Sequence, residues 1–386
     1  MERKDGFTRR AFLATLSGAA LAGAALAALG RRARGAPAPG APGWDLRVRG
    51  NSPEQWESSL EGLDHSWITR NDRFFVRNHL PVPQVDASSY RLEVAGLVRR
   101  PLSMSLAEIQ ALPAREAAHT LECAGNGRAY FRPFIPTGTL WERGAVGNAS
   151  WRGCPLSVLL ERAQVLPEAR HVWFEAADEA PKGEPRFLRS IPIQKAMAGT
   201  LLAYAMNEEP LPALHGGPLR AVVPGWYAMA STKWVTRVRV EPVPSDNRYM
   251  VGDYRYFREA ETGFAAPPVE ELQVKSVITR PLEGAVVPVG KLRVQGFAWA
   301  GDAGARLVEI SIDGGATWRP AGFMGTNTAY AWRTWATMVD VPEPARLTVM
   351  ARATDGNGAQ QPLYARYNAL GYANNAIHTV TVDIQE

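Results

Sequence analysis

The sequence has few cysteines, and this scarcity sets the first limits on its chemistry. Its 386 residues include two cysteines, Cys123 and Cys154, and contain neither a Cys-x-x-Cys-His haem motif nor a Cys/His cluster with zinc-ligand spacing. The disulfide frameworks of exported proteins need more cysteines in paired spacings. Two interpretations stay open: a single disulfide between the pair, or a thiolate with a chemical role.

Motifs for nucleotide binding are also missing. No Gly-x-Gly-x-x-Gly follows a predicted strand, and no Gly-Lys-Ser/Thr loop is present, so neither a dinucleotide-binding fold nor a P-loop is predicted. The net charge of +5 comes from residues 1–35, which carry seven Lys/Arg and two Asp/Glu. The remaining chain is neutral and has no long-range field for polyanions, which argues against nucleic acid as a partner.

Residues 1–35 have the layout of an export signal. Arg9 and Arg10 stand just before a Phe-Leu pair, and a run rich in Ala, Leu and Gly continues to Gly30. Paired arginines before Phe-Leu resemble the twin-arginine type of signal. A membrane anchor is the alternative, but the run has more Ala and Gly than the Leu-, Ile- and Phe-rich segments that span bilayers. We therefore expect a periplasmic or otherwise exported protein.

Two kinds of pattern divide the rest of the chain, whose length alone favours two domains. After an N-terminal extension over 36–70, residues 71–262 mix helix and strand signals and predict an α+β domain. Over 270–386, short strand-like runs alternate with turns such as Asp313-Gly-Gly, which predicts an all-β sandwich of immunoglobulin type. Packing or dimerisation is the role expected for this second domain.

Local patterns predict individual elements. Ser105-Leu-Ala-Glu108 is a capping box that opens a short helix ending near Pro113. Apolar residues at helical spacing predict a second helix from Pro155 to Val165. The expected strands are Leu219–Val223, Trp234–Val240, Leu292–Trp299, Leu307–Ile312, Leu347–Thr354 and His378–Ile384.

Chemically informative residues gather in three runs. Cys123 lies in His-Thr-Leu-Glu-Cys-Ala-Gly-Asn-Gly-Arg128, where glycines let a cofactor approach and Arg128 favours the thiolate. A soft thiolate suits metals that also accept sulfur, whereas a buried structural cysteine is the alternative. Residues 74–83 hold an Arg-Asn-His triplet in an aromatic, proline-rich frame, and residues 215–234 place cationic side chains beside a predicted buried strand, an arrangement that can hold a phosphate.

Together these runs resemble the sulfite oxidase family of molybdopterin enzymes, and the resemblance covers nearly all of the chain after the leader. It implies a molybdopterin-binding α+β domain, an immunoglobulin-like dimerisation domain, and one molybdenum–molybdopterin cofactor per chain without haem. The motifs that carry it are Phe-Val-Arg77-Asn-His79-Leu-Pro-Val-Pro, Glu-Cys123-Ala-Gly-Asn-Gly-Arg128, Leu-Ala-Tyr-Ala-Met-Asn207, His215-Gly-x-Pro-Leu-Arg220, Lys233-Trp234, Asp313-Gly-Gly-x-Thr-Trp318, Ala-Trp-Arg333-x-Trp335 and Asn368-x-x-Gly-Tyr372.

The resemblance also implies a role for each matching residue. Cys123 would be the single protein ligand of molybdenum, whose other sulfur ligands come from the pterin dithiolene. The residues implied around the anion and the metal are Arg77, Arg128, Tyr254 and Arg333. The residues implied to hold the pterin and its phosphate are Asn78, His79, Asp178, His215, Arg220, Ser231 and Lys233.

The implied activity is oxidation of sulfite, or of a similar small sulfur oxyanion, to sulfate. The sequence shows no fused haem or flavin domain, so we expect electrons to pass to a separate acceptor such as a c-type cytochrome, and the second domain to form a homodimer. Two alternatives remain: a molybdopterin reductase acting on a sulfoxide or a nitrate-like substrate, and a non-catalytic exported binding protein. Vertebrate and plant members of the family are rich in Gly and Ala where this chain has residues 226–230, Trp-Tyr-Ala-Met-Ala, a change expected to narrow or retune the substrate range.

Overall fold

The structure, a computed structural model, describes residues 46–257 and 263–386. The predicted export signal over 1–35 lies outside the described residues. Contacts join the described residues into one unit, and the predicted domain limits at 70/71 and 262/270 stay predictions. Within the two described ranges, no helix has the length and apolar character needed to cross a membrane.

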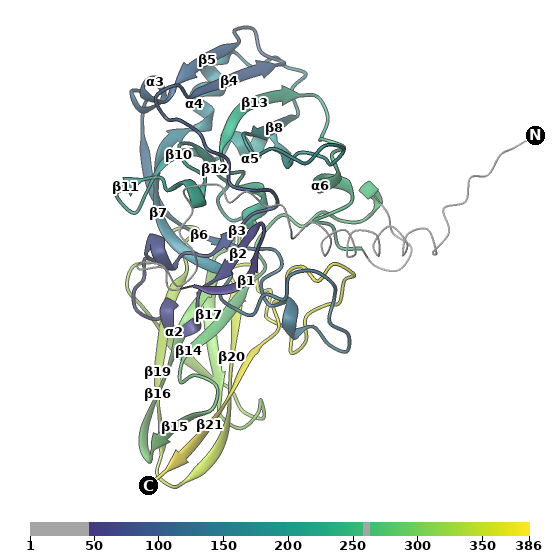
Figure 1. Cartoon of the computed structure of the whole chain (residues 1–386). Helices are drawn as coiled ribbons and strands as arrows, with labels where there is room; N and C mark the ends of the chain where they lie inside the picture. Colours follow the sequence, from purple (N-terminus) through teal and green to yellow (C-terminus); the bar gives the residue numbers. More distant parts are fainter. Residues whose placement is uncertain (1–45, 258–262) are drawn as a thin grey trace, which may run out of the picture. The chain divides into compact units, whose positions relative to one another are not determined.

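The strands before residue 257 build three sheets (Figure 1). They are β1 Arg47–Asn51, β2 Glu54–Glu57, β3 Val76–Arg77, β4 Arg91–Gly96, β5 Leu102–Ser105, β6 Arg115–Glu122, β7 Val146–Pro155, β8 His171–Ala176, β9 Leu188–Pro192, β10 Leu201–Met206, β11 Glu209–Pro210, β12 Arg220–Val222 and β13 Val235–Glu241. The first sheet has the order β1-β2-β3. It pairs Gln55 with Arg77, so part of the predicted extension supports the Arg-Asn-His triplet.

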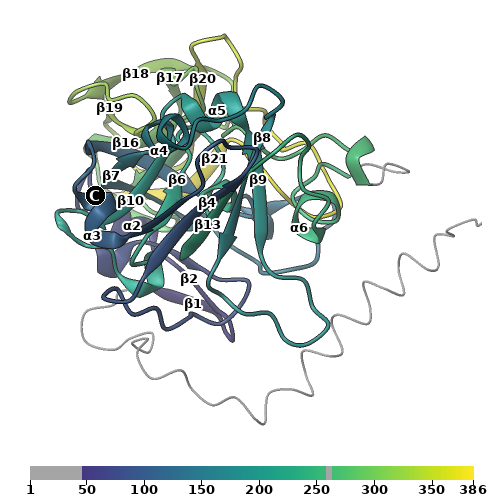
Figure 2. The same cartoon turned by 90° about the horizontal axis from the view of Figure 1, so that it is seen from above.

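The other two sheets of this domain form its main body. One has the order β11-β10-β7-β6, with β12 added on β10, and the other the order β5-β4-β13-β8-β9. Figure 2 shows β4, β13, β8 and β9 side by side; β13 runs parallel to β4 and antiparallel to β8. This mixed pairing confirms the predicted α+β class, because a regular βαβ winding would give parallel neighbours.

Helices are short, and α3 to α6 contact strands of the first domain, whereas α2 contacts β14 of the second. The predicted capping box at Ser105 is present, with both of its reciprocal hydrogen bonds to Glu108. The predicted helix after Pro155 runs over Leu156–Ala163, and its apolar stripe is fully buried, with β4, β7 and the helix Ile193–Met197 as its neighbours. The α-helices are α2 Leu60–Leu63, α3 Leu106–Gln110, α4 Leu156–Ala163, α5 Ile193–Met197 and α6 Arg248–Val251; the 3-10 helices are η1 Asn71–Arg73, η2 Arg128–Tyr130, η3 Ala213–His215, η4 Ala228–Ala230 and η5 Gly263–Ala265.

The second domain is the predicted all-β sandwich. Its strands are β14 Lys275–Arg280, β15 Ala285–Pro288, β16 Gly290–Trp299, β17 Ala305–Ser311, β18 Arg319–Met324, β19 Arg333–Val341, β20 Ala345–Asp355 and β21 His378–Gln385. Their order is β14-β16-β19-β18-β17-β20-β21-β15, and apolar side chains of β16, β17, β19, β20 and β21 form its core. The predicted Asp313 turn is present, with Gly314 and Gly315 at φ of +71° and +96°, values that favour glycine.

A third apolar cluster joins the two domains. Trp332, directly before β19, stacks on Phe297 with ring centroids 4.2 Å apart. The Trp332 indole N–H donates to the Trp67 carbonyl at 2.9 Å, and the Trp332 backbone N–H donates to the Thr120 hydroxyl at 2.8 Å. The sandwich therefore packs directly against β6, the strand that leads to Cys123.

Candidate active site

A cavity that is partly open to solvent lies in the first domain, and the empty space within it and at its mouth amounts to about 700 Å³. The end of β3, the end of β6, η3, η4 and the segment before β13 supply most of its wall. Ten of the twelve predicted site residues line it, so segments far apart in the sequence meet as expected. They are Arg77, Asn78, His79, Cys123, Asp178, His215, Arg220, Ser231, Lys233 and Tyr254.

Cys123 is presented at the tip of the turn that follows β6. Its backbone N–H donates to the Ala145 carbonyl at 2.9 Å, and its own carbonyl accepts from the Asn126 N–H at 2.9 Å. The side chain is 7% exposed and is not in a disulfide, so the structure contradicts the alternative of a Cys123–Cys154 bridge. Burial raises the pKa of the Cys123 thiol, and Arg77 is the largest influence that lowers it. A positively charged metal would favour the thiolate further.

The Arg-Asn-His triplet at the end of β3 forms one wall. The Arg77 guanidinium donates to the Asn78 carbonyl, while the Asn78 side chain donates to the Glu54 carboxylate at 2.9 Å. His79 stacks on Phe187 with ring centroids 4.4 Å apart. Burial, followed by the charge of Arg77, holds the pKa of His79 well below its ordinary value. The imidazole is therefore neutral at pH 7.

Tyr254 lies beside this triplet. Its hydroxyl oxygen is 2.5 Å from His79 Nε2, and its ring stacks on Tyr372 with centroids 5.0 Å apart. Tyr254 has a φ of +56°, a left-handed conformation that is uncommon for residues other than glycine. Burial raises the pKa of Tyr254 well above its ordinary value, so the phenol keeps its proton and can donate a hydrogen bond.

Cationic side chains form another part of the cavity. The Arg220 guanidinium donates to the carbonyls of His215 and Ser231, both at 2.8 Å, and Lys233 Nζ donates to the Asn78 side-chain oxygen and to the Leu214 carbonyl. These hydrogen-bond partners are all neutral, and the carboxylates of Asp178 and Glu54 act on Lys233 through their charge alone among the described residues. Burial lowers the pKa of Arg220 to about 9 and that of Lys233 well below its ordinary value. Such a pair fits a phosphate group.

The remaining polar groups of this wall are His215, Ser231 and Asp178. His215 Nε2–H donates to the Asn71 carbonyl at 2.8 Å, and the Ser231 hydroxyl accepts from the Val223 N–H at 2.9 Å. Asp178 is 3% exposed, and its Oδ1 has no hydrogen-bond partner within residues 46–257 and 263–386. Burial raises the pKa of Asp178 to about 6. A buried oxygen without a donor at a cavity wall fits a ligand that carries N–H groups.

Arg128 lies next to the cavity rather than on its wall. Its guanidinium donates to the carbonyls of Leu370 and Thr139 at 3.0 and 2.9 Å and lies 5.3 Å from the ring centroid of Tyr372. Arg128 also contributes to lowering the pKa of Cys123. Its charge therefore reaches the site, although its hydrogen bonds go to backbone oxygens.

The structure corrects the prediction for Arg333. This residue begins β19, where the register pairs it with Ala298. Its guanidinium lies 3.6 Å from the ring centroid of Phe323 and donates to the Ala305 carbonyl at 3.2 Å. These partners all belong to the sandwich, and Arg333 does not line the cavity. Arg333 is therefore not the third arginine of the pocket that the sequence predicts.

The sequence interpretation missed several wall residues. Phe187 and Met229 line the cavity, and Tyr372 of the second domain supports Tyr254. Met229 belongs to the bulky run over 226–230. The replacement of Gly and Ala by larger residues in this run was the feature of the sequence that could have identified Met229 as a wall residue. No local pattern marked Phe187, because it lies in a loop whose position depends on tertiary contacts.

Both domains of this chain match known protein families. The chain matches the profile of the oxidoreductase molybdopterin binding domain over residues 79–249 and that of the Mo-co oxidoreductase dimerisation domain over residues 266–385. Sulfite oxidase of Gallus gallus is 39% identical over 353 residues, which cover 86% of this chain and 77% of that protein. The chain belongs to the sulfite oxidase family of molybdopterin oxidoreductases.

Other members of the family extend this comparison. The mitochondrial sulfite oxidase of Homo sapiens is 38% identical over 357 residues, 87% of this chain and 65% of that protein; the chain thus spans somewhat less than two thirds of the human relative. The sulfane dehydrogenase SoxCD from Paracoccus pantotrophus, a solved structure, aligns with a TM-score of 0.78 and 26% identity and covers 93% of this chain and 95% of that one. The predicted fold, a molybdopterin-binding domain followed by a β-sandwich, is confirmed.

Proposed function

We propose that this protein oxidises sulfite to sulfate with a molybdenum–molybdopterin cofactor held by Cys123. One observation carries the proposal. The buried thiol of Cys123, the Arg77 guanidinium and the neutral Tyr254 phenol line the same cavity, so a soft metal ligand lies beside a cation and a hydrogen-bond donor. That combination suits a metal that reacts with a small oxyanion.

The residues present fit this cofactor. Arg220 and Lys233 would hold the phosphate, because both are cationic side chains on the cavity wall whose hydrogen-bond partners are neutral oxygens. Asp178 would accept from N–H groups of the pterin, which would satisfy its buried Oδ1. Cys123 would bind the molybdenum through its sulfur. When bound, the cofactor supplies the two-electron redox chemistry and the oxygen-atom transfer that no side chain can perform.

The protein's part is to bind and orient the anion. Arg77 would attract sulfite and fix its oxygens, with Arg128 adding positive potential from behind. Tyr254, which keeps its proton, would donate one hydrogen bond to an oxygen of the substrate. Phe75 and Leu121 line the same cavity and exclude water from part of it, which strengthens these electrostatic contacts.

Three further parts of the proposal concern the electron acceptor, the assembly and the location of the protein. A separate protein such as a c-type cytochrome would accept the electrons, the sandwich would join two chains into a homodimer, and the protein would act after export to the periplasm. The profile matched over residues 266–385 is that of a dimerisation domain, which supports the dimer. Measuring the molar mass in solution by light scattering tests it: a mass twice that of one chain is expected, and a monomer would contradict it.

The central experiment combines metal analysis with activity. Purified protein should contain about one molybdenum per chain and should reduce cytochrome c when sulfite is added. Sulfane sulfur, nitrate and a sulfoxide serve as alternative substrates, the first because of the structural likeness to sulfane dehydrogenase. If the protein contains molybdenum and turns over one of these compounds but not sulfite, the substrate assignment is wrong. If the protein contains no molybdenum after expression in cells that synthesise the cofactor, the proposed function is wrong.

A further inference from the structure

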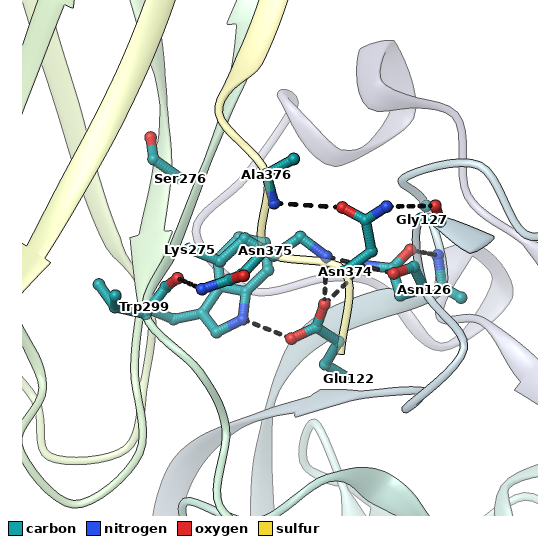
Figure 3. A network of polar contacts seen from close by, with 12 residues as sticks. Glu122, Asn126, Gly127, Lys275, Ser276, Trp299, Asn374, Asn375 and Ala376 are labelled. Atoms are coloured by element: carbon teal, nitrogen blue, oxygen red, sulfur yellow. Dashed lines mark hydrogen bonds and ion pairs between the residues drawn. The ribbon is translucent and has the colours of Figure 1, made fainter. Parts of the chain in front are cut away.

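A buried ion pair joins the sandwich to the turn that carries Cys123 (Figure 3). Glu122 is the last residue of β6 and directly precedes Cys123, while Lys275 is the first residue of β14. Lys275 Nζ lies 2.7 Å from Glu122 Oε1, and both side chains are 1% exposed. A fully buried ion pair between two domains holds them in one geometry, because each charge left alone would be costly.

The second oxygen of the same carboxylate is bound from the sandwich as well. The indole N–H of Trp299, at the end of β16, donates to Glu122 Oε2 at 2.8 Å. Asn126 Nδ2 donates to Oε1 at 2.9 Å. The carboxylate thus accepts from three donors, two of which come from the second domain, and its orientation is fixed from both sides.

Asn126 transmits this orientation to the turn. Its side-chain oxygen accepts from the Ala145 N–H at 3.2 Å, and its backbone N–H donates to the Cys123 carbonyl at 2.9 Å. The Ala145 carbonyl in turn accepts from the Cys123 N–H at 2.9 Å. A shift of Glu122 would therefore move Asn126, and Asn126 closes the turn that directs the Cys123 side chain.

The sandwich contacts the far side of the turn too. The Ala373 N–H donates to the Ala124 carbonyl at 2.8 Å, and the Asn374 side chain donates to the Gly127 carbonyl at 3.0 Å (Figure 3). Gly127 has a φ of +88°, which suits glycine. The segment from Glu122 to Gly127 is thus held at its start and at its end by one domain that supplies no wall residue of the cavity.

We propose that Lys275 and Trp299 are positioning residues for Cys123, so that the sandwich domain sets the geometry of the metal-binding turn in addition to any role in dimerisation. The inference rests on the proposed function, because it takes Cys123 as the metal ligand. Sub-ångström placement of a ligand matters here, since small displacements of a reacting centre cost large factors in rate.

The test uses five full-length proteins. Lys275→Gln leaves the Glu122 carboxylate buried without a cation, whereas the double variant Glu122→Gln/Lys275→Gln replaces the ion pair with a neutral amide pair that keeps a hydrogen bond. Trp299→Phe removes one donor and keeps an aromatic ring. Lys291→Gln is the matched control, because Lys291 belongs to the same sandwich and its ion pair with Asp340 is exposed, at 70% and 77%. The wild type completes the set.

The first measurement needs no cofactor. In cofactor-free protein, amide hydrogen exchange over residues 123–127 should be roughly tenfold faster in Lys275→Gln and Trp299→Phe than in the wild type, and should be slower in the double variant than in Lys275→Gln. The amides of strand β8 should exchange at the same rate in all five proteins. Lys291→Gln should have the exchange rates of the wild type in both segments.

The second measurement uses molybdenum-loaded protein. Per bound molybdenum, Lys275→Gln should lose roughly tenfold or more in kcat, with a shift of the thiolate-to-metal absorption band, and the double variant should recover part of both. If Lys275→Gln lowers only the melting temperature and the molybdenum content, with the exchange of residues 123–127 and the band per molybdenum unchanged, the positioning role is overturned. A wild type without molybdenum would overturn the proposed function instead, and the exchange experiment would still decide whether Lys275 holds the turn.

Discussion

Replacing Arg77 with glutamine should weaken the reaction with sulfite far more than it disturbs the fold. Arg77 lines the cavity. Burial raises the pKa of both Cys123 and Tyr254, and among the charges that lower these two pKa values Arg77 has the largest effect. The substitution removes a charge-assisted hydrogen bond to the anion, worth about 1.5–3 kcal/mol, which corresponds to a loss of about 10- to 150-fold in kcat/KM. Steady-state kinetics with sulfite and cytochrome c, normalised to bound molybdenum, measures the loss.

Arg333→Gln is the matched control for this experiment. Its guanidinium stacks on Phe323 in the sandwich, so kcat/KM should stay within about twofold of the wild type, as for a partly exposed residue outside the site. Two results would refute the reasoning: Arg77→Gln with an unchanged kcat/KM, or Arg333→Gln losing as much as Arg77→Gln.

Three further predictions concern other wall residues. Cys123→Ser should abolish sulfite oxidation while the far-UV circular dichroism stays as in the wild type; retained turnover would contradict the ligand role. Tyr254→Phe should lower kcat/KM about fivefold, the effect of losing one neutral hydrogen-bond donor, and a change below twofold in the same assay would argue against that donor. Burial raises the pKa of Asp178 from 3.8 to about 6, so its protonated form stabilises the cofactor-free fold at low pH, and this contribution is lost as the pH rises from about 4 to about 6. The unfolding free energy of the wild type minus that of Asp178→Asn, from urea titrations, should therefore fall by up to about 3 kcal/mol over that range; a constant difference would contradict the shift.

Local signals in the sequence were enough to predict much of the fold. The helix after Pro155 was predicted from apolar residues three and four apart, and these same residues are buried in the structure. The Ser105 capping box was predicted from the side chains that form it. Strands of the sandwich were found with ends within two residues of those observed, as for β16 and β21, because alternation and turn glycines are local properties.

The meeting of distant residues at the site followed from the family motifs rather than from periodicity. Spacing cannot show that Cys123 and Lys233 line one cavity. Arg333 shows how this reasoning fails. Trp332, one residue earlier, is the side chain that reaches the first domain, while Arg333 is already part of β19. One step along a strand changes which neighbours a side chain meets.

Contacts between the domains were beyond sequence reasoning. Glu122 and Lys275 are 153 residues apart, and neither stands in a pattern that marks it as buried. Alone, each charged residue favours the surface, and only the tertiary arrangement makes the pair possible. The same holds for the stacking of Tyr254 on Tyr372.

X-ray absorption at the molybdenum edge counts the sulfur atoms bound to the metal, and so tests whether Cys123 is a ligand. Wild type and Cys123→Ser are compared after loading with the cofactor. We expect Cys123→Ser to show one sulfur ligand fewer than the wild type, with an oxygen in its place. Equal numbers of sulfur ligands in the two proteins would show that the residue 123 side chain does not bind the metal.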